Sequence, residues 1–134
     1  MTDRAQDRWL QDIREAVRAI RLIEATGAHV AGSGADAVIA ADVDAVVVDA
    51  LTYRVMTIGE AVKNLDVAAR EARPEVPWSS IARMRDVITH HYHRRSLAVI
   101  RATVDQHLGA LDEAARWLLE EWPERASADG APEA

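Results

Sequence analysis

Apolar residues recur at steps of three and four over most of this chain, which is the period of an amphipathic helix. Near the N-terminus the recurring positions are Leu10, Ile13, Val17, Ile20 and Ile23. Comparable patterns cover residues 42–72, 79–91 and 97–122. Adjacent valines at 46–48 favour a strand locally, but about thirty residues without a turn signal favour a helix. The spacing therefore predicts an all-α fold, an up-and-down bundle of four main helices with one short helix.

Helix-capping and helix-breaking residues set the expected boundaries. Asp3 and Gln6 have the spacing of a capping box at the start of the first helix, and Gly27 is expected to end that helix. Asp42 is expected to cap the long second helix. The other expected features are a loop at 28–35, a short helical turn at 35–41, a break at Pro74 and Pro77, and a cap at Ser79 or Ser80. The residues of the next helix expected to face inward are Ile81, Met84, Val87 and Ile88.

The length and composition of the chain limit its class. A chain of 134 residues favours one domain, expected at 1–123, before a tail at 124–134 whose Ala, Ser, Asp, Gly, Pro and Glu content predicts disorder. The sequence has no cysteine, which excludes disulfides and thiolate chemistry. It has neither a run of about 18 apolar residues nor a signal-peptide pattern, so we expect a cytoplasmic protein without a membrane span.

The positive charge of the chain is concentrated in one segment. The net charge is −6, but residues 83–101 hold five arginines and one acid, a local charge of +4 that leaves −10 on the remainder. The same segment holds three of the five histidines. A basic segment on an acidic protein favours a local anion site, although the pattern also fits a solvated helix face.

This basic segment contains residues suited to RNA cleavage. Histidine transfers protons near neutral pH, and arginine holds a phosphate with its forked guanidinium group. Arg85 and His90 are the candidates for these two roles, and this route requires no metal or other cofactor. On a regular helix His90 lies roughly 140° around the axis from Arg85. Either the helix loosens near His90, or a second copy of the chain completes the site.

Each of these residues also has an ordinary structural explanation. Arg85 beside Asp86 fits a surface ion pair, and Tyr92 fits a half-buried aromatic residue. His90 and His93 are three residues apart, which is a usable spacing for a metal on a helix, but no carboxylate flanks them at a suitable distance. None of these residues therefore indicates chemistry on its own.

Residues 53–92 contain three short patterns in a fixed order. They are IGEA at 58–61 with KNL at 63–65, PW at 77–78 leading to MR at 84–85, and RX4HXY filled by Arg85, His90 and Tyr92. Together they resemble the HepT-like toxins of the HEPN superfamily, the toxin half of prokaryotic HEPN/MNT toxin–antitoxin pairs. Asp86 also fits, because that superfamily commonly has a polar residue after the arginine. The close match covers about forty residues.

The resemblance implies a metal-independent endoribonuclease. Such proteins form homodimers in which two RX4HXY motifs face one cleft, and motif position makes Arg85 and His90 the catalytic pair. The resemblance also implies an antitoxin of the minimal nucleotidyltransferase (MNT) fold, which in some pairs transfers AMP from ATP to the motif tyrosine, here Tyr92. An adenylate on Tyr92 would place negative charge in the path of the RNA.

Several residues and hypotheses remain open beside this interpretation. The residues expected to contact RNA are Arg94, Arg95 and Asp86. Glu60 has no assigned chemistry and could be a buried polar group that pairs with an arginine, while His91 and His93 could contact RNA or be solvated. Apolar residues on all sides of 43–61 also predict dimerisation. A second hypothesis is a non-catalytic helical subunit of a nucleotidyltransferase partner, and a third is a structural dimer with a vestigial motif.

Overall fold

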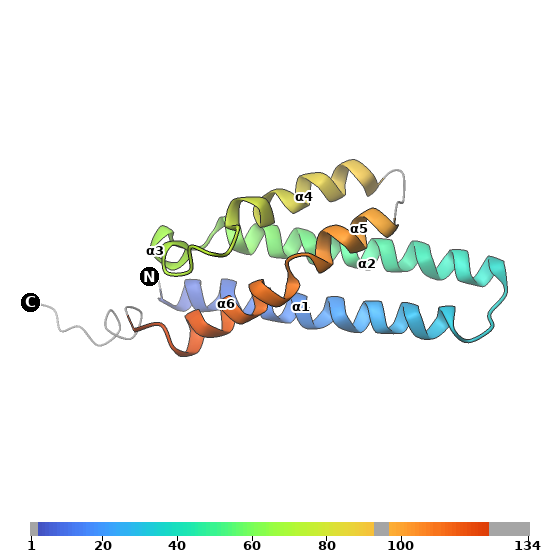
Figure 1. Cartoon of the computed structure of the whole chain (residues 1–134), viewed down its shortest axis with the longest axis horizontal. Coiled ribbons are helices and arrows are strands. Elements are labelled where there is room, and N and C mark those ends of the chain that lie inside the picture. The colour runs from blue at the N-terminus through green and yellow to red at the C-terminus, as the bar shows by residue number, and fades with distance from the viewer. Residues whose placement is uncertain (1–2, 93–96, 124–134) are drawn as a thin grey trace, which may run out of the picture.

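The computed structural model describes residues 3–92 and 97–123, and the regular elements in those ranges are all helices (Figure 1). They are α1 (Asp3–Ala31), α2 (Ala37–Lys63), α3 (Val67–Glu71), α4 (Trp78–Tyr92), α5 (Leu97–Asp105) and α6 (Leu108–Glu120). The prediction of an all-α fold is therefore confirmed. In the described part of the chain, no helix combines the length and the apolar character that crossing a membrane requires.

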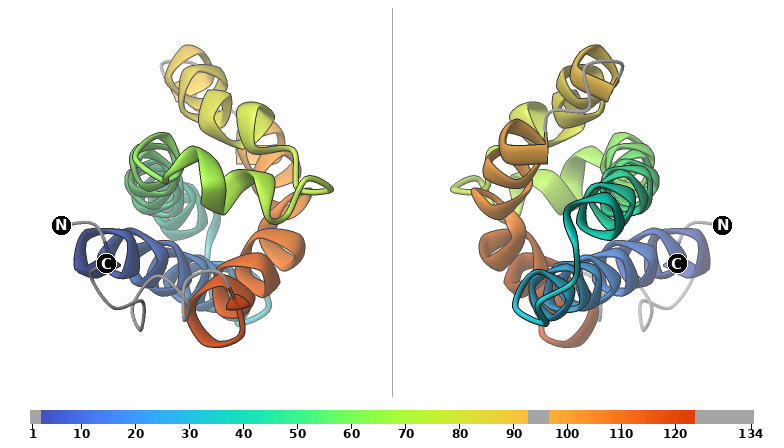
Figure 2. Two further views of the ribbon diagram at one scale, coloured as in Figure 1. Left: turned by 90° about the vertical axis from the view of Figure 1, so that its left-hand side faces the viewer. Right: turned by 90° about the vertical axis from the view of Figure 1, so that its right-hand side faces the viewer.

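The two longest helices, α1 and α2, form an antiparallel pair along the length of the molecule. α4 returns along α2, and α5 and α6 together run back as the fourth layer, with α6 against α1 (Figure 1). Seen end-on, these helices surround one interior (Figure 2). The buried side chains of the described residues are all apolar, and the largest include Leu10, Ile13, Ile20, Leu51, Ile58, Ile81, Ile88, Ile100, Leu111 and Leu118.

The inward positions predicted for α4 are confirmed with one exception. Ile81, Met84 and Ile88 are at most 2% exposed, whereas Val87 is 40% exposed. The expectation that Val87 faces inward is wrong because successive helical residues turn by about 100°. The three buried residues lie on one face, and Val87 lies about 100° from Ile88.

α1 continues through Gly27 to Ala31, so the prediction that Gly27 ends the helix is wrong. A Cβ atom added at Gly27 would lie 3.2 Å from both Arg101 Nη2 and Val47 Cγ2. This glycine therefore permits close packing against α5 and α2 inside a continuous helix. The chain turns at Gly34 instead, whose φ of 80° is a conformation that other residues rarely adopt.

α2 begins earlier than predicted. The side chain of Asp36, rather than that of Asp42, caps the helix by accepting a hydrogen bond from the backbone N–H of Ile39 at 2.9 Å. The separate turn expected at 35–41 is thus mostly the first turn and a half of α2. No helix-breaking residue separates the two segments, so one helix forms where the sequence suggested two.

α2 also ends earlier than predicted, at Lys63, because a side chain from α1 binds the backbone that follows. Gln6 Oε1 accepts a hydrogen bond from the backbone N–H of Asp66 at 2.8 Å, and Gln6 Nε2 donates to the carbonyl of Asn64 at 3.2 Å. Gln6 therefore fixes the junction between α2 and α3 rather than serving the capping box expected in α1. Residues 67–71 consequently form a separate short helix.

The predicted break between α3 and α4 is confirmed. α4 begins at Trp78, so the serines at 79–80 lie inside the helix and are not its cap. The indole Nε1 of Trp78 donates hydrogen bonds to the carbonyls of Arg70 and Arg73 at 3.1 and 3.0 Å. This tryptophan thereby fixes the start of α4 against the end of α3.

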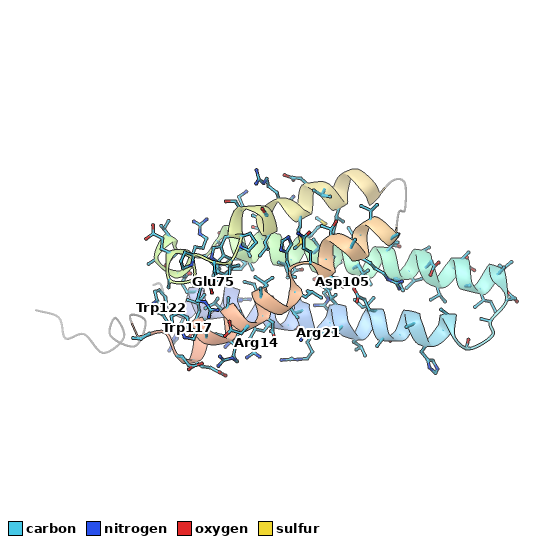
Figure 3. All side chains as sticks on the ribbon, viewed as in Figure 1. Arg14, Arg21, Glu75, Asp105, Trp117 and Trp122 are labelled. Carbon is cyan, nitrogen blue, oxygen red and sulfur yellow. The ribbon has the colours of Figure 1, made fainter. Side chains whose placement is uncertain are left out.

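The last predicted helix, 97–122, is divided into α5 and α6 around His107. The backbone N–H of His107 donates to the carbonyl three residues earlier, at Val104, over 3.1 Å, as in a tightened helical turn. α5 packs against α2 and α4, whereas α6 packs against α1, so the axis changes direction between them. Arg14 and Arg21, labelled in Figure 3, project from α1. They lie 3.2 and 3.8 Å from the carboxylate of Asp112 in α6.

Candidate functional site

α4 carries the motif arginine on the outside of the bundle. The side chains of Arg85 and Asp86 are both exposed. α4 remains α-helical through its last residue, Tyr92, so the structure does not show the loosening near His90 that was one of two expected alternatives. On such a helix Arg85 and His90 lie about 140° apart around the axis. One copy of α4 therefore does not align the two residues on one face.

The remaining motif positions lie outside the part of the chain whose side chains the structure describes. These positions are His90, His91 and Tyr92, together with His93, Arg94 and Arg95 in the segment 93–96. The roles expected for them therefore stay predictions.

Arg85 sits where α4 packs closely against a glycine of α2. A Cβ atom added at Gly59 would lie 3.3 Å from Arg85 Cβ and 3.5 Å from the carbonyl oxygen of Ala82. Gly59 belongs to the IGEA pattern at 58–61, and Arg85 belongs to the RX4HXY motif. Two of the sequence patterns that carried the family resemblance thus meet in space at this contact.

A hollow of about 330 Å³ lies beside Arg85. Its lining residues come from three helices and are Trp9 of α1, Tyr53, Met56, Thr57 and Glu60 of α2, and Arg85 of α4. The four residues of α2 are spaced three, one and three apart, so they share one face of that helix. The α2 face forms one wall of the hollow, and α1 and α4 each supply one side chain.

Glu60 is exposed, so the expectation that it is a buried polar group is wrong. Its Oε1 accepts a hydrogen bond from Asn64 Nδ2 at 3.3 Å, and the same amide donates to the Glu60 carbonyl at 2.8 Å. The carboxylate is therefore held at the edge of the hollow by its own helix. The exposed position also means that Glu60 is available to a bound molecule.

No pattern in the sequence indicated that Trp9, Tyr53, Met56 and Thr57 adjoin the motif arginine. The spacing at 53–60 predicts a shared helix face, but it does not say what that face meets. Trp9 is 76 positions away from Arg85 in the chain, and only the packing of α1 and α4 on either side of α2 brings them together.

Comparison with known proteins assigns the family. The model of the family described as "Ribonuclease HepT-like" matches residues 13–118. The chain belongs to the HepT-like ribonuclease family. The resemblance found in the sequence is thereby confirmed, and so is the predicted enzyme class, an endoribonuclease.

Individual relatives of this HepT-like chain agree with the family. "Putative RNase TTE0752" of Caldanaerobacter subterraneus subsp. tengcongensis is 35% identical over 77 residues, which cover 58% of this chain and 69% of that protein. "Probable ribonuclease HepT" of Thermococcus cleftensis is 39% identical over 54 residues, 40% of this chain and 49% of that protein. "Putative RNase MJ0127" of Methanocaldococcus jannaschii is 54% identical over 35 residues, 26% of this chain and 29% of that protein. No solved structure matches this chain significantly.

Proposed function

We propose that this HepT-like protein is the toxin of a toxin–antitoxin pair and cleaves cytoplasmic RNA without a metal, through Arg85 and His90. The observation that carries the proposal is the exposed Arg85 beside a hollow of about 330 Å³, in a chain of a ribonuclease family. A guanidinium group at the mouth of a hollow can hold a phosphodiester by two of its oxygens.

In the proposed reaction the 2′-hydroxyl oxygen attacks the adjacent phosphorus, and the bond from phosphorus to the 5′-oxygen breaks. Arg85 stabilises the charge on the non-bridging oxygens. His90 transfers the proton between the attacking and leaving oxygens. The products are a 2′,3′-cyclic phosphate and a 5′-hydroxyl end. One P–O bond forms for the one that breaks, and the proton of the 2′-hydroxyl ends on the 5′-oxygen, so the reaction needs no added cofactor.

The proposed enzyme is a homodimer whose two α4 helices line one cleft. A regular α4 separates Arg85 from His90 by about 140°, so pairing them across a dimer axis is the simplest arrangement that brings both to one phosphate. The N-terminal half of α2 supports dimerisation because Val38, Ile39 and Val46 are 72, 51 and 66% exposed.

The proposed regulation is modification of Tyr92 by an MNT-type nucleotidyltransferase antitoxin. The tyrosine oxygen would bond to the α-phosphorus of ATP, and pyrophosphate would leave. Tyr92 is seven residues after Arg85 in one helix, so the two positions lie within about 20° around the axis. An added adenylate would bring negative charge to the side of α4 that carries Arg85. Arg94, Arg95 and Asp86 are proposed to contact RNA, the two arginines through its phosphates.

The test is cleavage of labelled RNA by the purified protein in EDTA, with analysis of the product ends. We expect 2′,3′-cyclic phosphate ends, and a loss of at least about 100-fold in rate for Arg85→Ala and for His90→Ala. Arg83→Ala is the matched control, because Arg83 is an exposed arginine of the same helix outside the motif. Wild-type rates from the His90→Ala protein would refute the catalytic assignment. Intact RNA combined with tight antitoxin binding would favour the non-catalytic subunit instead.

A further inference from the structure

The hollow beside Arg85 contains more than a phosphate site requires. A phosphate is held by cations and N–H donors, whereas this hollow adds two aromatic side chains and a carboxylate to its arginine. The carboxylate of Glu60 would repel a phosphate placed next to it. The lining therefore suits a ligand that combines a negative group with a flat, hydrogen-bond-donating group.

The aromatic side chains offer surfaces on which a flat ring can stack. Trp9 is partly buried and packs against the core, so its indole is fixed by the fold. Tyr53 is 63% exposed, and the guanidinium carbon of Arg54 lies 5.4 Å from the centre of its ring. Unpaired RNA bases are commonly recognised by stacking on aromatic side chains of this kind. The volume of about 330 Å³ lies at the small end of ligand sites, as one nucleoside requires.

The carboxylate of Glu60 distinguishes among the four bases. An ionised carboxylate only accepts hydrogen bonds. Guanine presents two adjacent donors, N1–H and the N2 amino group, on its Watson–Crick edge. Adenine and cytosine each present one donor next to an acceptor there, and uracil presents one donor between two acceptors. Glu60 therefore matches guanine at two points and opposes an acceptor in each of the other bases.

We propose that the hollow binds a guanine base of the RNA, adjacent to the phosphate held by Arg85, and that Glu60 is the residue that determines this specificity. The inference rests on the proposed function, because it places the base beside the scissile phosphate. The base stacks against Trp9 or Tyr53, and its Watson–Crick edge faces Glu60. The bound base and Arg85 together position one nucleotide.

The test uses DNA oligonucleotides that contain a single ribonucleotide, so that cleavage through a 2′-hydroxyl occurs at one phosphate only. All sixteen combinations of the bases on either side of that phosphate are compared. We expect kcat/KM to be about 10- to 100-fold higher when guanine occupies one of the two positions. Equal kcat/KM for all sixteen substrates would overturn the proposal.

Glu60→Gln is the decisive variant because it replaces an acceptor-only group with one that donates and accepts. Its amide pairs with one donor and a neighbouring acceptor, and every base presents such a pair on its Watson–Crick edge, so the variant no longer selects the two adjacent donors of guanine. We expect the guanine preference to fall by about tenfold or more and adenine substrates to improve relative to guanine, while cleavage itself persists. Glu71→Gln removes the same charge from an exposed residue of α3 outside the hollow and must keep the wild-type preference. If both variants lost the guanine preference equally, the loss would come from the removed charge alone. That result would contradict the proposal that the hollow binds guanine.

A binding measurement separates failure of the pocket from failure of the proposed nuclease. The same sequences with a 2′-O-methyl group cannot be cleaved, and their affinities for the full chain follow from fluorescence anisotropy. Guanine-selective binding that Glu60→Gln abolishes supports the pocket even if no substrate is cleaved, in which case only the nuclease proposal fails. Equal affinities for all four bases, with RNA cleavage intact, would contradict the proposed guanine site but not the proposed nuclease activity.

Discussion

Gly59 of α2 lies so close to Arg85 of α4 that a Cβ atom at position 59 would be 3.3 Å from the Cβ atom of Arg85. Such a separation is shorter than an ordinary van der Waals contact between carbon atoms. The place of the motif arginine is therefore set by a residue on another helix, 26 positions earlier in the chain. A side chain at position 59 would require Arg85, the group proposed to hold the phosphate, to give way by a few tenths of an ångström.

Gly59→Ala should lower RNA cleavage more than it lowers stability. Alanine is favoured over glycine inside a helix by about 1 kcal/mol, which offsets part of the crowding against Arg85. Small displacements of a phosphate-binding group reduce rates strongly, by up to about 100-fold per ångström. We expect a change in the free energy of unfolding within about 1 kcal/mol and a fall of about tenfold or more in kcat/KM. Denaturant titration and the RNA assay measure the two quantities.

Gly109→Ala is the control for this prediction. A Cβ atom at Gly109 in α6 would have no neighbour within 4 Å, so only the helix-forming preference of alanine changes. We expect a gain of up to about 1 kcal/mol in stability and unchanged cleavage. Unchanged cleavage by Gly59→Ala as well would show that the close contact does not position Arg85.

Val46→Glu should convert the proposed dimer into a monomer. Val46 is 66% exposed in the single chain, so the charge costs the folded monomer little, within about 0.5 kcal/mol. In a dimer contact the same charge would be buried without a partner. Light scattering should give a mass near one chain, and RNA cleavage should be lost with it. Val67→Glu, at a 60% exposed valine of α3, should leave the mass unchanged. A wild-type mass near one chain would remove the basis for a shared cleft.

Glu24 should make the stability of the protein fall as the pH rises from about 4.5 to 7. Burial, and then a hydrogen bond with Asp105 and the charge of that residue, raise the pKa of Glu24 to about 7, while the charge of Arg101 acts in the opposite direction. The folded state therefore binds a proton that the unfolded state releases above its ordinary pKa. That contribution to stability is complete below pH 4.5 and is lost as the pH passes through about 7.

Glu24→Gln tests this pH dependence, because glutamine keeps the shape of the protonated acid. We expect the variant to be more stable than the wild type at pH 8 by about 1 to 2 kcal/mol, a figure reduced for the partial exposure of the side chain. The difference should shrink at pH 4.5. Denaturant titrations at both pH values give the comparison, with Glu15→Gln, an exposed position on the same helix, as the control. A difference in the free energy of unfolding between Glu24→Gln and the wild type that stays constant from pH 4.5 to 8 would contradict the raised pKa of Glu24.

Arg73→Gln should destabilise the protein near neutral pH and less so in acid. Arg73 donates hydrogen bonds to Glu75 over 2.6 Å and to Glu113 of α6, and its guanidinium carbon lies 5.2 Å from the centre of the Trp117 ring. The hydrogen bonds from Arg73 lower the pKa values of Glu75 and Glu113. We expect a loss of about 1 to 2 kcal/mol at pH 7, largely from the ring contact and packing.

The stability that the Arg73 ion pairs contribute should depend on pH in the opposite direction to the stability that Glu24 contributes. A carboxylate with a lowered pKa stabilises the folded state above its ordinary pKa, and this contribution is lost as the pH falls through the lowered value. The difference in melting temperature between Arg73→Gln and the wild type should therefore narrow below about pH 4. A difference that does not change with pH would assign the effect of Arg73 to its packing on Trp117 alone.

The sequence by itself determined the helical fold, most of the core and the family. Apolar spacing depends only on the period of the helix, so Leu10, Ile13 and Ile88 could be placed inside without knowing their partners. The break at 72–77 was equally predictable, because proline lacks the backbone N–H that a helix interior needs. The motif that includes Arg85 was recognisable because it is contiguous.

Only the tertiary structure decided where α1 and α2 end and what surrounds Arg85. Gly27 and Gln6 have local patterns typical of helix ends, but both are used for contacts with residues of other helices, Gly27 beside Arg101 and Gln6 with Asn64. The hollow is likewise assembled from three helices, and Glu60 is exposed in it rather than buried. Local preferences are worth about 1 kcal/mol or less per residue, so packing between distant segments overrides them.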